Sequence, residues 1–187
     1  MKNKRKLKFK IISMVRDPIA RQISDVFQNP EIMKIDIKNQ NGLINKNRAM
    51  ALIQENFSNL RTFDYIFKWF DREIKSVFGI DAFSKPFNRD SGWTIINGEN
   101  AEVLVLRLEN LSQIGPEVIS DFLTLPNQIS LVESNVRAST KDVLSYNYVK
   151  NNIRIDRSIC REIYASRFCS HFYGDKEINK FMKRWAG

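Results

Sequence analysis

The sequence predicts an α/β layered domain in which one strand precedes a group of helices, and further strands lie before a helical end. Two short apolar runs, residues 8–15 and 103–108, are rich in β-branched residues and typical of buried strands. Apolar residues recur at helical spacing between these strands, and residues 158–172 and 175–185 are predicted as two helices that close the chain. This order favours helices layered on a sheet over an all-helical bundle.

The first strand leads directly into a helix. Asp17 is a good N-cap, and Pro18 suits the first helical position, where no backbone N–H is needed. Asn29-Pro30 predicts the end of this helix. The apolar residues that share one face are Ile19, Ile23, Val26 and Phe27.

Two more helices are predicted in the first half of the chain, after a turn at 39–42. They cover residues 47–60 and 63–78, and Gly79 suits the end of the second.

Residues 80–87 and 93–96 look extended, and Asn97-Gly98 is a strong hairpin signal before the 103–108 strand. Residues 116–123 are predicted as a short helix that Pro126 terminates. The stretch 128–148 gives an ambiguous loop with some extended character.

Length and composition favour one domain over residues 1–187. Hydrophobic residues make up 43% of the chain, which is enough for a core. No apolar run approaches the roughly 20 residues of a membrane span, and no secretion signal follows the basic start. We therefore expect a cytoplasmic protein.

The two cysteines, Cys160 and Cys169, are expected to be buried reduced thiols; a single disulfide between them is the less favoured alternative. His171 is the only histidine. Without a Cys/His cluster, no metal is expected. His171 is a base by type, but its aromatic neighbours favour a packed structural residue.

The net charge of +9 favours an anionic partner. Nucleotides, phosphorylated or sulfated sugars, nucleic acids and membrane surfaces all qualify. The basic residues of the first ten positions are compatible with peripheral membrane association or with a solvated tail.

Residues 14–24 form the strongest candidate site, because an arginine leaves a strand just before a helix N-terminus. Such a junction can bind an anion through free N–H groups and the planar guanidinium. Ser24 lies about 9 Å along the helix from Pro18, so a phosphate touching both would lie beside the helix. The alternative is structural: Arg16 is solvated and Arg21 pairs with Asp25.

Arg16 and Ser24, in the context of Asp17-Pro18, resemble the 3′-phosphate-binding motif of sulfotransferases that use 3′-phosphoadenosine 5′-phosphosulfate (PAPS). The resemblance implies that Arg16 and Ser24 hold the 3′-phosphate of the donor. Asp-Pro after the arginine is similar to the carbohydrate sulfotransferases in particular.

Two further stretches support the resemblance. Residues 103–111 and 121–123 are similar to a family strand ending in Tyr-Glu-Asp-Leu and to a helix ending in Phe-Leu-Gly, with Leu108, Asn110 and Thr124 replacing the tyrosine, aspartate and glycine. Glu109 retains the glutamate; a surface or helix-capping carboxylate is the equal alternative.

Residues 69–73, 78–87 and 168–185 resemble a bacterial family of capsular polysaccharide synthesis proteins, a branch of the sulfotransferase-like fold. Taken together, the resemblances run from about Ile11 to Trp185. They imply a three-layer P-loop-like sulfotransferase fold with a helical C-terminal part.

The resemblance also implies a glycine-rich loop with Lys or Arg and Ser or Thr, which cradles the 5′-phosphosulfate. Only fifteen residues precede Arg16, and the later glycines stand singly. We therefore expect an N-terminally incomplete fold with weak or no catalysis. Residues 135–141, with Arg137 and Lys141, match the position of a basic loop over the donor; a solvated loop is the alternative.

The leading functional hypothesis is a sulfotransferase-like protein of surface-polysaccharide synthesis, with PAPS as co-substrate and a carbohydrate acceptor. No catalytic residue can be assigned. The first alternative is a non-catalytic module that binds nucleotides or anionic glycans. The second is a basic nucleic-acid binder, although no recognisable nucleic-acid motif is present and specific nucleic-acid recognition is not expected.

Overall fold

The computed structural model describes residues 8–29, 36–40, 42–132 and 143–187. The chain forms two compact units. The first contains Met1–Arg16, Phe67–Val132 and His171–Gly174. The second contains the remaining segments, Asp17–Ile66, Glu133–Ser170 and Asp175–Gly187. The division into compact units does not test the expectation of one sulfotransferase-like domain over 1–187, which stays a prediction.

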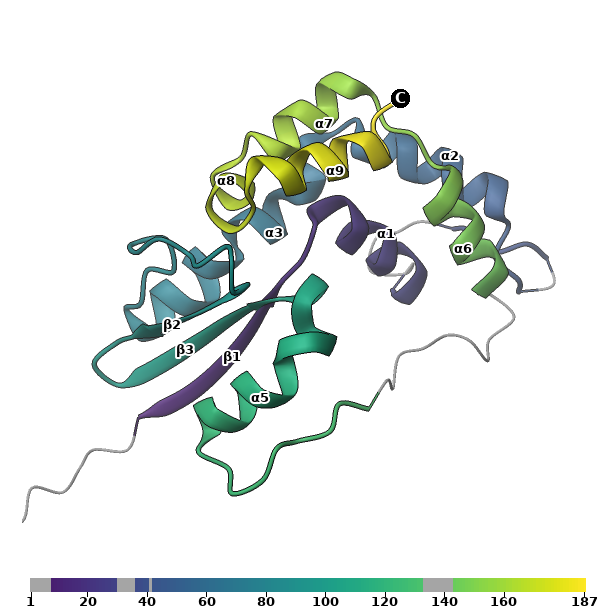
Figure 1. The fold of residues 1–187 in the computed structure, drawn as a ribbon. Helices are drawn as coiled ribbons and strands as arrows, with labels where there is room; N and C mark the ends of the chain where they lie inside the picture. Colours follow the sequence, from purple (N-terminus) through teal and green to yellow (C-terminus); the bar gives the residue numbers. More distant parts are fainter. Residues whose placement is uncertain (1–7, 30–35, 41, 133–142) are drawn as a thin grey trace, which may run out of the picture. The chain divides into compact units, whose positions relative to one another are not determined.

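The first unit is built on a three-stranded sheet with the order β1-β3-β2 (Figure 1). Strands β1 (Phe9–Val15) and β3 (Ala101–Arg107) are parallel, which confirms both apolar runs as strands. Strand β2 (Trp93–Asn97) pairs antiparallel with β3 through a short hairpin, in which Gly98 N donates to the Ala101 carbonyl at 2.8 Å. The predicted hairpin is therefore confirmed, with Asn97 as the last residue of β2.

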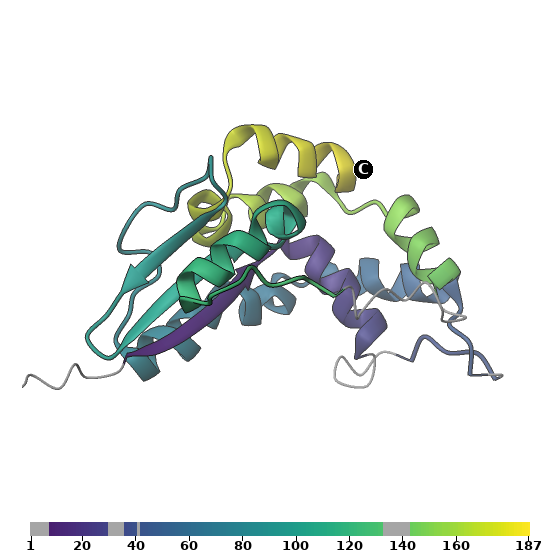
Figure 2. The same ribbon diagram turned by 60° about the horizontal axis from the view of Figure 1, so that its bottom comes forward.

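Helix α5 (Leu111–Leu123) packs against one face of β1 and β3 (Figures 1 and 2). Because side chains alternate along a strand, the residues of β3 that face α5 are Leu104 and Leu106. They form a buried cluster with Val118, Ile119 and Phe122. The helix begins five residues before the predicted start at Pro116, which lies inside it.

A second helical segment of the first unit comes just before the sheet hairpin. It consists of α3 (Asp64–Trp69, whose start belongs to the second unit), a π-helical stretch η2 (Phe70–Lys75) and α4 (Ser76–Phe78). The predicted helix over 63–78 is confirmed in position. Gly79 ends it at φ +69°, a left-handed conformation that favours glycine.

The expectation of extended structure over 80–87 is wrong, because this stretch folds into turns. Asp81 Oδ1 accepts the Phe83 backbone N–H at 2.9 Å, and the Asp81 carbonyl accepts the Ser84 N–H at 3.2 Å. An aspartate that bonds the backbone two residues ahead forms a turn instead of a strand. The Phe83 and Phe87 rings pack against Phe172, which accounts for the apolar content.

The second unit is helical in the residues that the structure describes. Its first half contains α1 (Pro18–Gln28), α2 (Lys46–Phe57) and η1 (Leu60–Phe63). The boundaries of α1 confirm the predicted start at Pro18 and end at Asn29. All four apolar residues of its predicted face are buried.

The second half of this unit differs from the prediction at two places. Helix α6 (Val143–Asn152) begins within the stretch predicted as an ambiguous loop. The sequence does not predict this helix because its residues lack a clear apolar face. The predicted single helix over 158–172 is two helices, α7 (Arg157–Tyr164) and α8 (Arg167–Phe172, whose last two residues belong to the first unit), separated at Ala165-Ser166. The last helix, α9 (Asp175–Trp185), agrees with the prediction.

Candidate functional site

The carboxyl ends of β1 and β3 bring two arginines to the same end of the sheet. Val15 pairs with Arg107 in the parallel register, so Arg107 ends β3 and Arg16 follows β1 by one residue. In open α/β sheets, ligands bind beyond the carboxyl ends of parallel strands. This end of the first unit is therefore the candidate anion site.

Arg107 is 3% exposed and belongs to a polar network that the sequence did not reveal. Its Nε donates to Asn110 Oδ1 at 3.0 Å, and its Nη2 donates to the Arg89 carbonyl at 2.6 Å. The guanidinium carbon also lies 5.9 Å from the centre of the Tyr173 ring. These contacts fix the guanidinium, because an arginine fork held by several partners loses most of its rotational freedom.

Gly92 completes the packing around this network. Its φ is +76°, and a Cβ at this position would lie 2.7 Å from Asn110 Oδ1 and 3.3 Å from Arg107 Nη2. A side chain at residue 92 would therefore displace the amide that holds Arg107.

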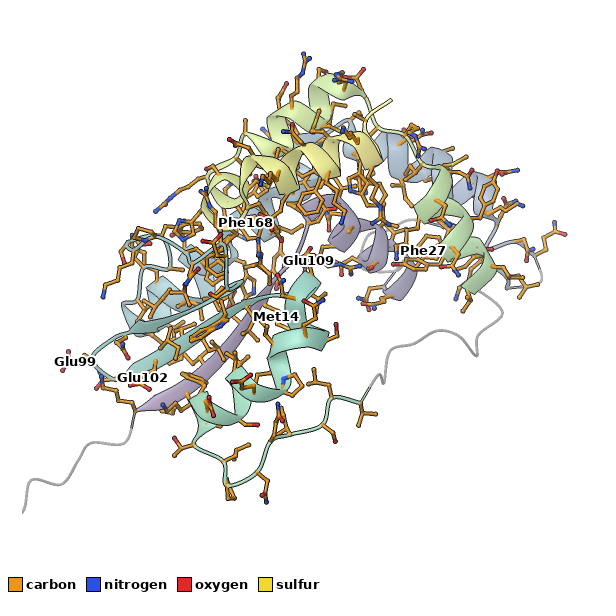
Figure 3. All side chains as sticks on the ribbon, in the orientation of Figure 1. Met14, Phe27, Glu99, Glu102, Glu109 and Phe168 are labelled. Carbon is orange, nitrogen blue, oxygen red and sulfur yellow. The ribbon has the colours of Figure 1, made fainter. Side chains whose placement is uncertain are left out.

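Glu109 lies at the same end of the sheet, beyond β3, whereas Glu99 and Glu102 lie at the hairpin end (Figure 3). The Glu109 side chain is exposed, and its Oε2 accepts a hydrogen bond from the Tyr173 hydroxyl at 3.4 Å. The position fits the surface carboxylate of the sequence analysis. It also makes Glu109 a carboxylate within the candidate anion site.

Asp17 belongs to the second unit, where it is 3% exposed. Its Oδ1 accepts the Ile19 backbone N–H at 3.1 Å, as predicted for an N-cap, and also the Tyr164 hydroxyl at 2.9 Å. Its Oδ2 accepts Trp185 Nε1–H at 2.6 Å. Asp17 therefore ties the start of α1 to α7 and α9.

Ser24 lies on α1 in the second unit and is 9% exposed. Its hydroxyl lies 3.2 Å from the Tyr146 hydroxyl of α6. Either of these two hydroxyls can donate to the other. Arg16 and Ser24 belong to different units, so their joint role in binding a phosphate stays a prediction.

Arg21 and Asp25 form the predicted i,i+4 ion pair, with Nη1 and Oδ2 2.8 Å apart. This part of the structural alternative is confirmed. Arg16 itself is half-buried and is not the fully solvated residue of that alternative.

His171 packs as the aromatic neighbours predicted. Its ring makes edge contacts with Phe83 and Phe172, at centroid distances of 5.0 and 4.7 Å, and its carbonyl accepts from Arg89 Nε at 3.3 Å. These contacts favour the structural role over that of a base.

Cys160 and Cys169 are free and buried, which confirms the expected thiols. Burial, with a smaller contribution from the Asp17 carboxylate, raises the pKa of Cys160 to about 11. Burial likewise raises the pKa of Cys169 to about 12. Burial and then Asp17 raise the pKa of Tyr164 far above its usual range, so its hydroxyl remains a donor to Asp17.

The parts of the chain outside the described residues hold three expectations: the donor-covering role of Arg137 and Lys141, membrane association of the basic start, and the Pro30 helix stop. Over the ranges that the structure does describe, no three His, Cys, Asp or Glu side chains come together as a metal site. Over the same ranges, no helix is both long and apolar enough to cross a membrane.

The fold and the site define a mixed α/β protein in which a small sheet ends in two arginines. Residues 41–174, well over half of the chain, match the model of a family described as "Putative capsular polysaccharide synthesis protein". The chain belongs to this family, as the resemblance predicted, and its family name connects it with capsular polysaccharide synthesis. The matched residues include Arg107 and Glu109 but neither Arg16 nor Ser24.

No curated protein and no solved structure gives a significant match to the chain. The mixed α/β class is confirmed by the structure itself. The sulfotransferase-like organisation stays a prediction.

Proposed function

We propose that the chain is a cytoplasmic, sulfotransferase-like protein of capsular or surface polysaccharide synthesis, whose co-substrate is PAPS and whose acceptor is a sugar hydroxyl. The observation that carries the proposal is the pair of arginines, Arg16 and Arg107, at the carboxyl ends of two adjacent parallel strands. A donor with several anionic groups needs fixed positive charge of this kind. Guanidinium groups suit phosphate and sulfonate oxygens, since both can be bound by two N–H groups at once.

In the proposed division of roles, Arg16 binds the 3′-phosphate of the donor together with the Ser24 hydroxyl. Arg107 is a positioning residue, because it is buried and its fork already holds Asn110 and the Arg89 carbonyl. It keeps the end of β3 rigid and contributes positive potential to the site.

The proposed reaction is an in-line displacement at sulfur, without a metal. The bond between sulfur and the bridging phosphate oxygen breaks, and a bond from sulfur to the acceptor oxygen forms. The nucleotide leaves as adenosine 3′,5′-bisphosphate, and the acceptor proton passes to a base. We propose Glu109 as this base, because it is an exposed carboxylate at the same end of the sheet.

Calorimetric titration with adenosine 3′,5′-bisphosphate tests the donor site. We expect binding at the micromolar level. Arg16→Ala should weaken it about 10- to 100-fold, because a charge-assisted hydrogen bond contributes about 1.5–3 kcal/mol. Glu109→Gln should leave bisphosphate binding unchanged and lower sulfonate transfer from PAPS.

Arg21→Ala is the matched control, because Arg21 is also an arginine beside the start of α1 but pairs with Asp25. If Arg16→Ala and Arg21→Ala weakened bisphosphate binding equally, the effect would come from net charge and not from a contact of Arg16. A folded wild-type chain that does not bind bisphosphate would exclude the donor site in these residues.

A second candidate function is a non-catalytic nucleotide-binding or anionic-glycan-binding module. It keeps the anion site at Arg16 and Ser24 but needs no transfer chemistry, and it is compatible with the single, scattered glycines of the sequence. Bisphosphate binding without transfer to any acceptor would support this module. Binding to any duplex, with affinity that falls steeply with salt and does not depend on Ser24, would instead favour nucleic acid.

A further inference from the structure

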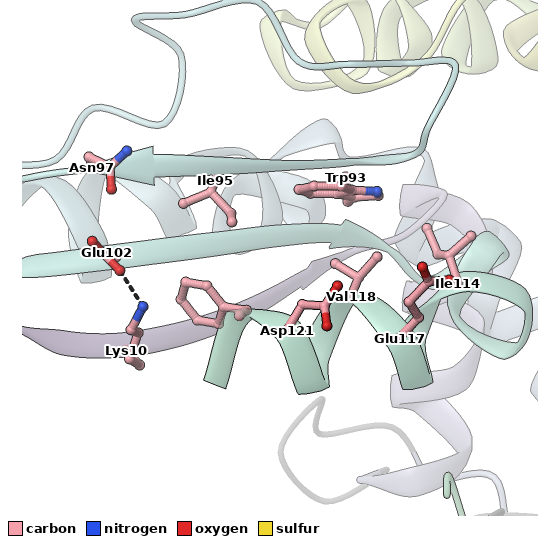
Figure 4. Close-up of a pocket in the computed structure, with 10 residues that line it drawn as sticks. Lys10, Trp93, Ile95, Asn97, Glu102, Ile114, Glu117, Val118 and Asp121 are labelled. Carbon is pink, nitrogen blue, oxygen red and sulfur yellow. Dashed lines mark hydrogen bonds and ion pairs between the residues drawn. The ribbon is translucent and has the colours of Figure 1, made fainter. Parts of the chain in front are cut away.

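A groove of about 500 Å³ lies on the face of the sheet that α5 covers (Figure 4). One wall is β2, from which Trp93, Ile95 and Asn97 project on the same side because they alternate along the strand. The other wall is α5, which contributes Glu117 and Asp121. The groove lies wholly within the first unit.

The groove exists because α5 packs against β1 and β3 and leaves the same face of β2 less covered. Ile95, in the middle of β2, is 36% exposed although it is apolar. Trp93 is half-buried and packs against the Leu104 and Leu106 cluster, which fixes its ring. A rigid indole beside an apolar floor is a preformed binding surface, and the volume is in the range of ligand pockets.

The rim of the groove is acidic, although the whole chain has a net charge of +9. Glu102 is paired with Lys10 at one end, and the hydrogen bond from Lys10 lowers the pKa of Glu102. Glu117 and Asp121, four residues apart on α5, add two exposed carboxylates. Apart from the Lys10–Glu102 pair, which is neutral overall, the charged groups that line the groove are therefore negative.

We propose that this groove binds one or two uncharged sugar rings of the acceptor glycan. Sugar rings have apolar C–H faces, which pack on an indole, and a rim of hydroxyl groups. The Glu117 and Asp121 carboxylates are strong acceptors for those hydroxyls, and the Asn97 amide can both donate and accept. The volume suits one or two pyranose rings.

The acidic rim also sets which sugars enter. A carboxylated or sulfonated ring would meet Glu117 and Asp121 as like charges and is rejected, whereas a neutral ring is not. The inference rests on the proposed function, because it assigns the groove to the acceptor of the same reaction. Under that assignment, a ring that has gained a sulfonate no longer fits the groove, which favours release of the product.

The test is binding of neutral sugars to the complete 187-residue chain, measured by saturation-transfer NMR and by tryptophan fluorescence. The probes are methyl glycosides of glucose, galactose, mannose and N-acetylglucosamine, with maltose, cellobiose and N,N′-diacetylchitobiose. We expect at least one probe to bind with a Kd of about 1 mM or tighter. Digalacturonic acid is the charged probe and should not bind.

Three variants locate the binding. Trp93→Phe retains an aromatic ring in the core and should remove the fluorescence response. The double variant Glu117→Gln/Asp121→Asn should weaken the neutral sugar about fivefold or more and admit digalacturonic acid, since the acceptors are weakened and the repulsion is removed. Glu162→Gln, an exposed glutamate on α7 of the second unit, is the matched control and should change neither.

Several outcomes overturn the inference. These are the absence of binding by every neutral probe below about 20 mM, an unchanged affinity in the double variant, and a fluorescence change that depends on protein concentration alone. The last would identify a second copy of the chain in the groove. Failure here is separate from failure of the donor site, because bisphosphate binding is measured without sugar and depends on Arg16.

Discussion

Asp17 in the second unit and Arg107 in the first unit are both buried charged side chains, and they differ in which partners hold them. Asp17, in the second unit, accepts hydrogen bonds from the Ile19 backbone, Tyr164 and Trp185. Arg107, in the first unit, donates to Asn110 three residues away and to the Arg89 carbonyl. Two of the partners of Asp17, Tyr164 and Trp185, come from distant helices, whereas those of Arg107 come from its own strand end and the loop before β2.

The difference shows two uses of a buried charge. Asp17 connects helices that are far apart in the sequence, so its loss affects the packing of the whole second unit. Arg107 shapes one end of the sheet, so its loss affects a local surface. A charged residue in a motif can therefore serve the fold more than the chemistry, and Asp17 is such a residue.

Replacement of Asp17 should give the largest effect. Asp17→Ala removes the helix cap, which costs about 1 kcal/mol, and leaves the Tyr164 and Trp185 donors buried without an acceptor, at about 1–3 kcal/mol each. We expect the free energy of unfolding to fall by about 3 kcal/mol or more, as measured by urea unfolding followed by circular dichroism.

Asp25→Ala is the control for this change, since it removes an aspartate from the same helix. It breaks the Arg21 pair, which is partly exposed to solvent, and should cost much less than Asp17→Ala, about 1 kcal/mol or less. If both variants lost the same small amount, Asp17 would not be the link between the helices.

We expect a smaller loss in the free energy of unfolding when a glycine beside Arg107 is replaced, because the charge of Arg107 is kept and only the packing around it changes. Gly92→Ala forces a Cβ against Asn110 Oδ1 and also strains a left-handed residue. Gly79→Ala has the same backbone strain, at φ +69°, but its Cβ would meet open space. We expect losses of about 2–3 kcal/mol for Gly92→Ala and about 1 kcal/mol for Gly79→Ala.

Urea unfolding of the two glycine variants makes the comparison directly. The difference between them isolates the contact with Asn110, because the backbone cost is shared. Equal losses would show that the Arg107–Asn110 bond adjusts freely, and the rigid role given to Arg107 would be wrong.

The smallest effect concerns the two thiols near Asp17. The pKa of Cys160 is raised to about 11 and that of Cys169 to about 12, so unfolded thiols lose their protons at lower pH than folded ones. The contribution of the two protonated thiols to the free energy of unfolding is therefore fully present below the unfolded thiol pKa of about 8.5. It is lost as the pH rises toward the folded pKa values.

Alkylation with iodoacetamide at pH 8.5 measures the same property. The folded chain should react slowly, and the urea-unfolded chain should react fast at both thiols. A Cys160→Ala/Cys169→Ala variant should show a shallower loss of stability between pH 9 and 11. Fast alkylation of the folded chain would contradict the burial of both thiols.

The local signals in the sequence predicted much of the fold. Asp17-Pro18, Asn97-Gly98 and Gly79 mark a cap, a hairpin and a helix end, and each depends on neighbours within a few residues. The stretch 143–148 was predicted as loop because a helix without an apolar face gives no period to detect. The apolar stretch 80–87 forms turns because Asp81 accepts a hydrogen bond from the Phe83 backbone, and the spacing of apolar residues does not reveal such a bond.

The candidate site was only partly predictable, for a related reason. Arg16 and Ser24 were found through a motif, whereas Arg107 lies in an apolar strand and gave no signal of its own. Its significance depends on the parallel pairing of β3 with β1, which is a long-range contact. Tyr146 beside Ser24, and Trp93 in the groove, are likewise brought to their sites by the tertiary fold.

The parallel pairing of β1 with β3 has a consequence for biosynthesis. Partners such as Lys10 and Glu102 are 92 residues apart, whereas β2 and β3 are joined by a short hairpin. At a translation rate of about 5–20 residues per second, β1 leaves the ribosome about 5–20 s before its partner strand. The hairpin can close within microseconds once it is made. Strand β1 is thus made well before the strand with which it pairs, and during that interval the nascent chain carries an apolar segment whose partner strand has not yet been made.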